Sequence, residues 1–256
     1  MRVAIKFAYD GKKFQGYARQ PGLKTVEDEL IKSLVKHRII NDVKESYFRS
    51  ASRTDKNVSA LGNVVAFNTD LSKKNILKNL SESSSILFYG IKEVESEFNP
   101  RFAKLRQYRY CLKTTGLDKE KIISATACFT GKHDFSNFAR VESFRDPIRT
   151  IDNIIFTSED DILIIDFYAQ TFLWHQIRRI ISALIKVGSN KIEKEQIINA
   201  LDNPKKKIDF GLAPAEPLVL MDIVYNFEFE YNKKSLKKLG LFKKDLARFI
   251  CKKHKS

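Results

Sequence analysis

Hydrophobic residues recur with two different periods along the chain. Residues 3–9 alternate between large apolar and shorter or polar side chains and precede Asp10-Gly11, which predicts a strand ending in a turn. Residues 25–38 carry apolar side chains at helical spacing behind a capping residue, Thr25, which predicts a helix. The same periods predict strands near residues 47–48, 63–67, 86–94, 108–112, 162–168 and 219–230, and helices over 72–80, 117–129, 172–188, 194–201 and 236–249.

These elements mix helices with strands in no strict strand–helix–strand order. Such mixing favours an α+β fold with mainly antiparallel sheets. Asn99-Pro100 is a candidate joint, because proline keeps the residue before it out of the helical region. We therefore expect an N-terminal α/β subdomain over 1–98, a C-terminal α/β subdomain over 99–231, and a basic amphipathic tail over 232–256.

Charge indicates a polyanionic partner. The net charge is +15, but the segment from Lys233 onward supplies +9 of it, with ten Lys/Arg residues and one Asp, leaving +6 for the rest. The tail can be read in two ways, as a docked helix with a solvated basic face or as a helix whose basic face also binds RNA phosphates. Charge alone does not separate RNA from DNA or from an anionic membrane.

Composition also argues against several classes of protein. The apolar runs fall far short of the roughly 20 residues that cross a bilayer, and the first residues lack the apolar core of a signal peptide. We therefore expect a cytoplasmic protein. The three cysteines and four histidines show no spacing typical of zinc ligands, so no metal site is expected.

Asp55 is the first residue with candidate chemistry. An aspartate between two strands is most often a turn residue that caps its own backbone. Asp55, however, stands between Arg53 and Lys56, and nearby cations stabilise an ionised carboxylate. An ionised carboxylate suits a nucleophile better than a general acid, and from this segment alone both interpretations stay open.

Two further positions can be read either as core or as site. Arg178 lies at the margin of the apolar stripe of the 172–188 helix, where a guanidinium needs a partner, and a structural ion pair would satisfy it. Tyr108 and Tyr110 share one face of a strand, which is typical of core residues. The same rings could instead stack on a base that has been taken out of an RNA helix.

Six groups of residues carry a family resemblance when taken in order along the chain. They are Tyr9-Asp10-Gly11 with Phe14 and Gly16-Tyr17; Arg53-Thr54-Asp55 with Val58-Ser59-Ala60; Asn99-Pro100-Arg101-Phe102 with Arg106, Tyr108 and Tyr110; Gly131 with His133-Asp134-Phe135; Phe172-Leu173 with His175-Gln176-Ile177-Arg178; and Gly211 to Leu218. The sequence resembles the tRNA pseudouridine synthase A (TruA) family, on its archaeal and eukaryotic branch. Asn57 stands where glycine is usual, and asparagine tolerates the left-handed backbone expected there.

The resemblance implies a fold and a set of catalytic residues. The fold would be two α/β subdomains with mainly antiparallel sheets joined around a central basic cleft, the pseudouridine synthase fold. Asp55 would be the nucleophile that starts cleavage of the uridine glycosidic bond, with Arg178 as its ion-pair partner. Arg53 would help to displace the flipped base and Tyr108 would stack on the uracil. Further contacts to the substrate are expected from Lys56, Ser59, Tyr110, Arg106, His175 and Arg101.

The resemblance also implies the partners. Family members act on uridines of the tRNA anticodon stem-loop as homodimers and need no metal or organic cofactor. Two alternatives stay within the fold: an RNA-binding protein without activity, or a related pseudouridine synthase with other RNA targets. A third, a metal-dependent nuclease, would need carboxylates beside Asp55, for which Asp134 and Asp166 are candidates.

Overall fold

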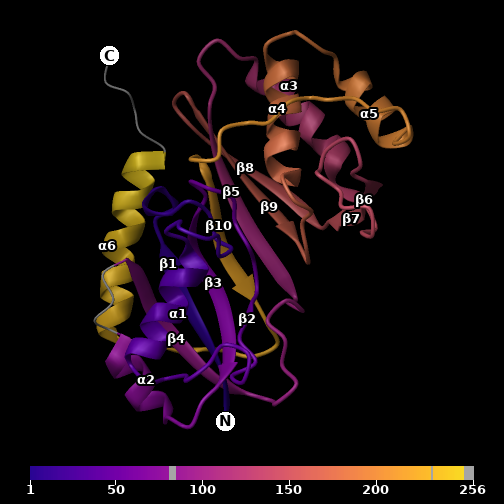
Figure 1. Cartoon of the computed structure of the whole chain (residues 1–256). Helices are drawn as coiled ribbons and strands as arrows, with labels where there is room; N and C mark the ends of the chain where they lie inside the picture. The colour runs from indigo at the N-terminus through magenta and orange to yellow at the C-terminus, as the bar shows by residue number, and fades with distance from the viewer. Residues whose placement is uncertain (81–84, 232, 251–256) are drawn as a thin grey trace. The chain divides into compact units, whose positions relative to one another are not determined.

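The computed structural model describes residues 1–80, 85–231 and 233–250, and it divides the chain into two compact units (Figure 1). Residues 1–104 and the chain from residue 219 onward form one, which we call the split unit. Residues 105–218 form the other, the inserted unit. The division differs from the expected boundary at residue 98, and it groups residues 219–231 with the N-terminal part of the chain.

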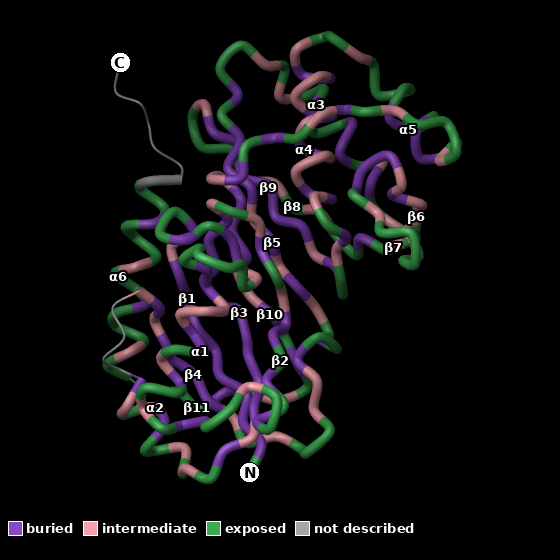
Figure 2. The backbone as a smooth tube through the Cα atoms, in the orientation of Figure 1, coloured by how far each residue is buried: buried purple, intermediate pink, exposed green. Residues whose placement is uncertain are grey.

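The split unit is built on one sheet whose strands run in the order β11-β4-β1-β3-β10. The strands are β1 (Arg2–Tyr9), β3 (Ser59–Asn68), β4 (Ile86–Val94), β10 (Leu218–Val224) and β11 (Glu230–Tyr231), with β2 (Arg49–Ser50) also paired to β3. The pairing of β1 with β3 and β4 is antiparallel, whereas β10 runs parallel to β3. Every residue of β1 is buried, so both faces of this strand are covered (Figure 2).

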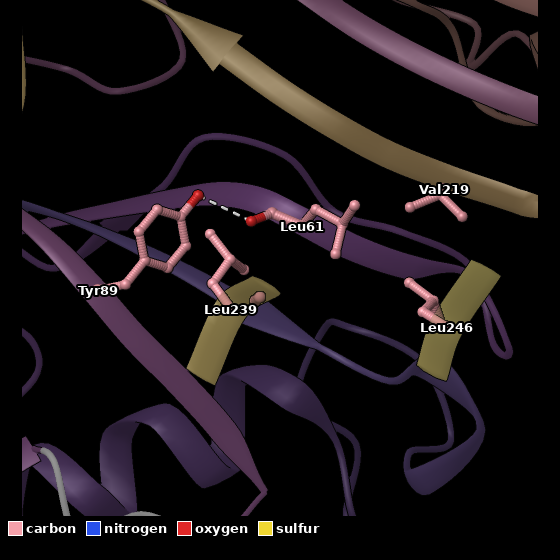
Figure 3. Close-up of a cluster of buried hydrophobic side chains, with 6 residues drawn as sticks. Leu61, Tyr89, Val219, Leu239 and Leu246 are labelled. Atoms are coloured by element: carbon pink, nitrogen blue, oxygen red, sulfur yellow. Dashed lines mark hydrogen bonds between the residues drawn. The ribbon is translucent and has the colours of Figure 1, made fainter. Parts of the chain in front are cut away.

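One face of this sheet is covered by α6 (Lys233–Ile250). Leu239 and Leu246 of the helix join a buried cluster with Ala8, Leu61 and Tyr89 of the strands, and the Tyr89 hydroxyl donates to the Leu61 carbonyl at 2.8 Å (Figure 3). The part of the tail that the structure describes is therefore a helix whose apolar face packs on this sheet. Residues 232 and 251–256 of the expected tail lie outside the described residues.

The opposite face carries aromatic side chains. Strand residues alternate between faces, so Phe7 and Tyr9 point away from α6. Tyr9 lies 6.1 Å from Phe14 and 6.3 Å from Tyr17, measured between ring centroids, and all four rings are buried. α1 (Val26–Lys36) follows them, capped by the Thr25 hydroxyl, which accepts from the Asp28 amide. The two shorter helices of this unit are the 3-10 turn Gly11–Lys13 and α2 (Lys73–Leu80).

The main strands of the inserted unit lie in the order β5-β9-β8, and β9 pairs antiparallel with both of its neighbours. Its elements are β5 (Leu105–Lys113), α3 (Lys119–Thr126), a 3-10 turn (Ala127–Phe129), β6 (Gly131–Asp134), β7 (Ile148–Ile151), β8 (Asn153–Glu159), β9 (Ile162–Ala169), α4 (Gln176–Gly188) and α5 (Lys194–Asp202). α3 packs against α4 at Gly188, where a Cβ would lie 2.7 Å from the Ile122 side chain. A side chain at this position would displace Ile122, so the small size of glycine allows the two helices to pack closely.

The mixed α+β class with mainly antiparallel sheets is confirmed in both units, but two predicted elements have other bounds and three strands were not predicted. The strand predicted over 219–230 ends at Val224, because Tyr225 stacks on Phe227 at 5.2 Å and both rings pack on Phe98. The chain then pairs β11 with β4 at the other edge of the sheet. The helix predicted from residue 172 begins at Gln176, and the strands β6, β7 and β8 were not predicted.

Within the described part of the chain, no helix is long and apolar enough to cross a membrane.

Candidate active site

Asp55 lies in the loop that joins β2 to β3, at a tight turn. The Val58 amide donates to the Asp55 carbonyl at 3.2 Å, and Asn57 within this turn has φ +70°. Asn57 therefore adopts the left-handed conformation expected from the sequence. Asp55 is half-buried, between Thr54, which is buried, and Lys56, which is exposed.

A buried asparagine holds the start of this loop. Asn63 of β3 is fully buried, and its Nδ2 donates to the Ser52 carbonyl at 2.9 Å while its Oδ1 accepts from the Val64 amide. One residue earlier, the Ala51 amide donates to the Val64 carbonyl. The backbone that leads to Arg53 and Asp55 is thus attached to β3 by both side-chain and main-chain bonds.

Thr54 attaches the middle of the loop to the aromatic face of the sheet. Its hydroxyl lies 2.8 Å from the hydroxyl of Tyr9, and its carbonyl accepts from the Tyr17 amide at 3.2 Å. Since Thr54 is buried and Arg53 is exposed, the loop turns the Arg53 side chain outward while its backbone stays fixed.

The end of the loop packs against Gly11. A Cβ at Gly11 would lie 2.4 Å from the Val58 carbonyl oxygen, so any side chain would displace the loop. The Gly11 amide donates to Ser59 Oγ at 3.0 Å, and Ser59 is 2% exposed. A hydroxyl buried in this way is suited to holding the loop in place, whereas its expected contact with substrate stays a prediction.

The loop therefore presents a carboxylate from an anchored backbone with two exposed cations beside it. Preorganisation of this kind is what a nucleophile needs, because small displacements of a reacting group lower rates strongly. Arg101, another expected substrate contact, is also exposed in the split unit, in the turn after β4 where its amide donates to Asn99 Oδ1.

In the inserted unit, Arg178 is held at the start of α4. Its Nε donates to the Ala213 carbonyl at 2.9 Å, and its own carbonyl accepts from the Ala213 amide at 3.2 Å. A guanidinium fixed at Nε presents its terminal nitrogens in one direction, which suits recognition of a carboxylate or phosphate.

Tyr110 binds the same segment as Arg178. It is 2% exposed, its hydroxyl donates to the Pro214 carbonyl at 3.1 Å, and burial raises its pKa well above the usual tyrosine value. The Tyr110 hydroxyl therefore holds residues 213–214 in place, and the contact with substrate expected for this residue stays a prediction.

Tyr108, Arg106 and His175 gather around the segment that precedes α4. The Tyr108 ring is 9% exposed and meets Phe172 edge to face at 5.3 Å. Arg106 is 5% exposed and donates to the Gln170 carbonyl, while His175 is half-buried at the N-terminus of α4. The structure thus brings the predicted site residues of this unit to one segment, residues 170–178, and to the strand beside it.

Comparisons with known proteins decide the family. A family model described as tRNA pseudouridine synthase matches residues 125–226. A protein of Thermococcus sibiricus named tRNA pseudouridine synthase A is 46% identical over 246 residues, which cover 93% of this chain and 91% of the relative. Proteins of the same name from Pyrococcus furiosus and Methanothermobacter thermautotrophicus are 40% and 35% identical, covering 93% and 90% of this chain and 89% and 83% of the relatives. The chain belongs to the tRNA pseudouridine synthase A family.

In this tRNA pseudouridine synthase A family member, the two carboxylates considered for a metal-dependent nuclease, Asp134 and Asp166, bind other groups of the protein. Asp166 forms a two-pronged ion pair with Arg109, with N···O distances of 3.0 and 2.8 Å, and is 6% exposed. Asp134 accepts from the Ser136 amide in a local turn. Among the described residues, no three His, Cys, Asp or Glu side chains are grouped as metal ligands.

Residue patterns alone missed the groups that hold the Asp55 loop in this family member. Asn63 was assigned to a strand, but a polar residue in an otherwise apolar run, Val64 to Phe67, is a signal that its side chain has a buried partner. Thr54 gave no such signal, because its partner Tyr9 is 45 residues away in the chain.

Proposed function

We propose that this chain is an isomerase that converts uridine to pseudouridine in tRNA, with Asp55 as the nucleophile. The observation that carries the proposal is the anchored loop, which holds one carboxylate between the exposed cations Arg53 and Lys56. The glycosidic bond to N1 of uracil breaks, the base rotates, and C5 bonds to the ribose carbon while the C5 proton is lost and N1 gains one. No net oxidation occurs, so the reaction requires no redox cofactor.

The remaining predicted residues receive roles within this proposal. Chemistry on a paired base requires its removal from the stack, which costs a few kcal/mol, so the enzyme needs a surface for the base and cations for the backbone. We assign the base to Tyr108, whose ring is supported by Phe172, and the replacement of the base to Arg53. Arg178, held by Ala213, supplies a guanidinium to an anion of the site.

Other residues and partners are finer parts of the same proposal. Lys56 and Arg101 are exposed cations that suit RNA phosphates, and His175 borders the same segment as Tyr108. We also propose the anticodon stem-loop as the target, a homodimer as the active form and the cytoplasm as the location. Mapping of pseudouridines in tRNA from cells that lack the protein tests the target. Sedimentation of the protein with and without tRNA tests whether the active form is a homodimer.

Replacement of Asp55 tests the catalytic role. We expect Asp55→Asn and Asp55→Ala to abolish pseudouridine formation in a tRNA transcript while tRNA affinity stays within about twofold, because only the nucleophile is lost. Glu45→Gln, which changes an exposed carboxylate of the same unit, is the matched control and should retain full activity.

The same assay distinguishes the alternative functions. The wild-type protein is incubated with tRNA in the presence of a chelator. Pseudouridine formation supports the proposal, binding without product indicates a non-catalytic RNA-binding protein, and strand cleavage on addition of metal indicates a nuclease. Substantial turnover by Asp55→Ala would show that another residue is the nucleophile.

A further inference from the structure

Trp174 is a large aromatic residue that the proposed reaction does not use. It lies in the segment between β9 and α4 of the inserted unit, and 45% of its surface is exposed. It is also the single tryptophan of the chain. A half-exposed indole gains only part of the stabilisation that a buried tryptophan gives to a fold. Its exposed surface is therefore available for binding, and the residues around it indicate what it could bind.

Arg140 stacks on this ring. The centre of its guanidinium lies 4.2 Å from the centroid of the Trp174 ring, and its amide donates to the Trp174 carbonyl at 2.8 Å. This backbone bridge fixes the two residues opposite each other, so the Arg140 side chain can lie over the ring with little loss of conformational freedom. Arg140 is itself exposed, so its guanidinium covers the indole while its outer surface faces solvent.

The backbone beside Trp174 is held in an uncommon conformation. His175 has φ +65°, and its ring centroid lies 4.9 Å from that of Trp174. A non-glycine residue in the left-handed region is strained and persists where the surrounding structure fixes it. Here Gln176 fixes it, because its side-chain oxygen accepts from the Leu173 amide. The segment thus orients Trp174 and His175 at some cost in stability.

A purely structural role is the simpler explanation of the cation–π pair, but it does not explain why both partners are exposed beside a strained residue. Such pairs stabilise a protein most when both partners are removed from water. Trp174 and Arg140 both remain exposed, so their pairing contributes little stability to offset the strain at His175. Indole faces and guanidinium planes are, in contrast, the surfaces on which proteins stack unpaired RNA bases.

We propose that Trp174 and Arg140 form a stacking surface for an unpaired base of the RNA substrate, separate from the target uridine. The proposal rests on the proposed function, since it requires RNA as the substrate. The surface belongs to the same segment as Phe172, which supports the Tyr108 ring, and Arg178. A second base held on this segment would fix the loop of the RNA relative to the base that is modified.

Tryptophan fluorescence tests the proposal in the unaltered protein. Because Trp174 is the single tryptophan, emission excited selectively from tryptophan reports this ring alone. We expect an RNA hairpin with an unpaired loop to quench the emission, with the same midpoint as binding measured by anisotropy of labelled RNA. A fully paired duplex of equal length should bind without quenching. Hairpin binding with unchanged emission would overturn the proposal.

Substitutions separate stacking from a structural role. Trp174→Ala should weaken hairpin binding roughly tenfold, Trp174→Phe should recover most of the affinity because a ring is restored, and Arg140→Ala should weaken it less. Phe144→Ala, at an 81% exposed ring of the same unit, is the matched control and should bind as the wild type does. Equal hairpin affinity for Trp174→Ala and the wild type would contradict the proposal.

The experiment distinguishes a failure of the stacking surface from a failure of the proposed reaction. Pseudouridine formation in tRNA is measured in parallel on the wild-type protein. If product forms and the hairpin leaves the emission unchanged, the stacking surface is wrong and the proposed function stands. If no product forms but the hairpin quenches the emission, the stacking surface stands and the catalytic proposal fails.

Discussion

At the scale of single residues, the site depends on side chains that do no chemistry. Asn63 joins β3 to the loop, Thr54 joins the loop to Tyr9, and Gly11 leaves the space that Val58 occupies. None of these carries a charge, and each acts on the position of the backbone near Asp55. The position of the Asp55 carboxylate therefore depends on several residues that take no part in the proposed reaction.

Asn63 offers a test of this dependence. Asn63→Ala removes the donor to the half-buried Ser52 carbonyl and the acceptor of the buried Val64 amide, which should lower the free energy of unfolding by about 1–3 kcal/mol. We expect a much lower kcat for pseudouridine formation with nearly unchanged tRNA affinity, because the loop can shift while the binding surfaces remain. Single-turnover kinetics and anisotropy measure the two effects.

A control for this variant lies on the same strand. Asn68→Ala changes a half-buried asparagine at the far end of β3, whose Oδ1 accepts from Arg2. It should lower stability without a selective loss of kcat. Equal kcat in Asn63→Ala and the wild type, at a temperature where both are folded, would show that the loop keeps its position without Asn63.

Buried tyrosines set an alkaline limit to stability. Burial raises the pKa values of Tyr17, Tyr89 and Tyr110 above the ordinary value near 10. In the unfolded chain these hydroxyls ionise above pH 10, whereas in the folded protein they keep their protons. Their stabilising effect is thus complete below pH 10 and is lost as the pH rises, by up to about 1.4 kcal/mol per pH unit for each tyrosine.

Denaturant unfolding between pH 8 and pH 12 (roughly the span around the tyrosine pKa) measures this loss. Tyr89→Phe should be less stable at neutral pH, because the bond to Leu61 is gone, yet should lose stability less steeply at alkaline pH. Tyr47→Phe, at a 62% exposed ring, should leave the slope unchanged. Equal slopes for Tyr89→Phe and the wild type would contradict the contribution assigned to Tyr89.

At the scale of elements, periodicity was informative where one element buries one face. β1, β4, α1 and α2 were found at the predicted places, because alternation or helical spacing reflects burial directly. Alternation misled at residues 219–230, since Tyr225, Phe227 and Phe229 bury their rings against one another without strand pairing. β8 was missed because most of its residues are exposed, which leaves a weak pattern.

The basic face of α6 can be separated from its apolar face. At 100° per residue, Lys233, Lys237, Lys244 and Arg248 fall within about 60° of one another, opposite Leu239 and Leu246. Replacing these four cations by glutamine keeps the docked face intact, so thermal unfolding should be unchanged. If the face binds RNA phosphates, tRNA affinity falls and the slope of log affinity against log salt decreases by about 0.7–0.9 per lost contact.

A charge-preserving variant is the control for this prediction. Lys233→Arg, Lys237→Arg and Lys244→Arg together retain the charge and should retain both affinity and salt slope. If the glutamine variant also keeps the wild-type salt slope, the basic face is a solvated one, as the simpler interpretation of the tail holds.

At the scale of the whole molecule, the sequence supported the fold class and the family more strongly than the site. Residue patterns left Asp55 as a turn or a nucleophile, and the order of six groups along the chain was needed to favour the second. Long-range partners such as Tyr9 and Thr54, or Arg178 and Ala213, could not be derived from spacing, because they depend on how distant segments pack.

The division of the chain has a consequence for synthesis. The inserted unit is one continuous stretch, residues 105–218, whereas the sheet of the split unit lacks two strands and the covering helix α6 until residues 218–250 have been made. Domains generally fold as units as they leave the ribosome. The inserted unit is therefore complete before the split unit, although its translation begins later. The sheet beside the Asp55 loop remains uncovered on one side until residues 218–250 have been made.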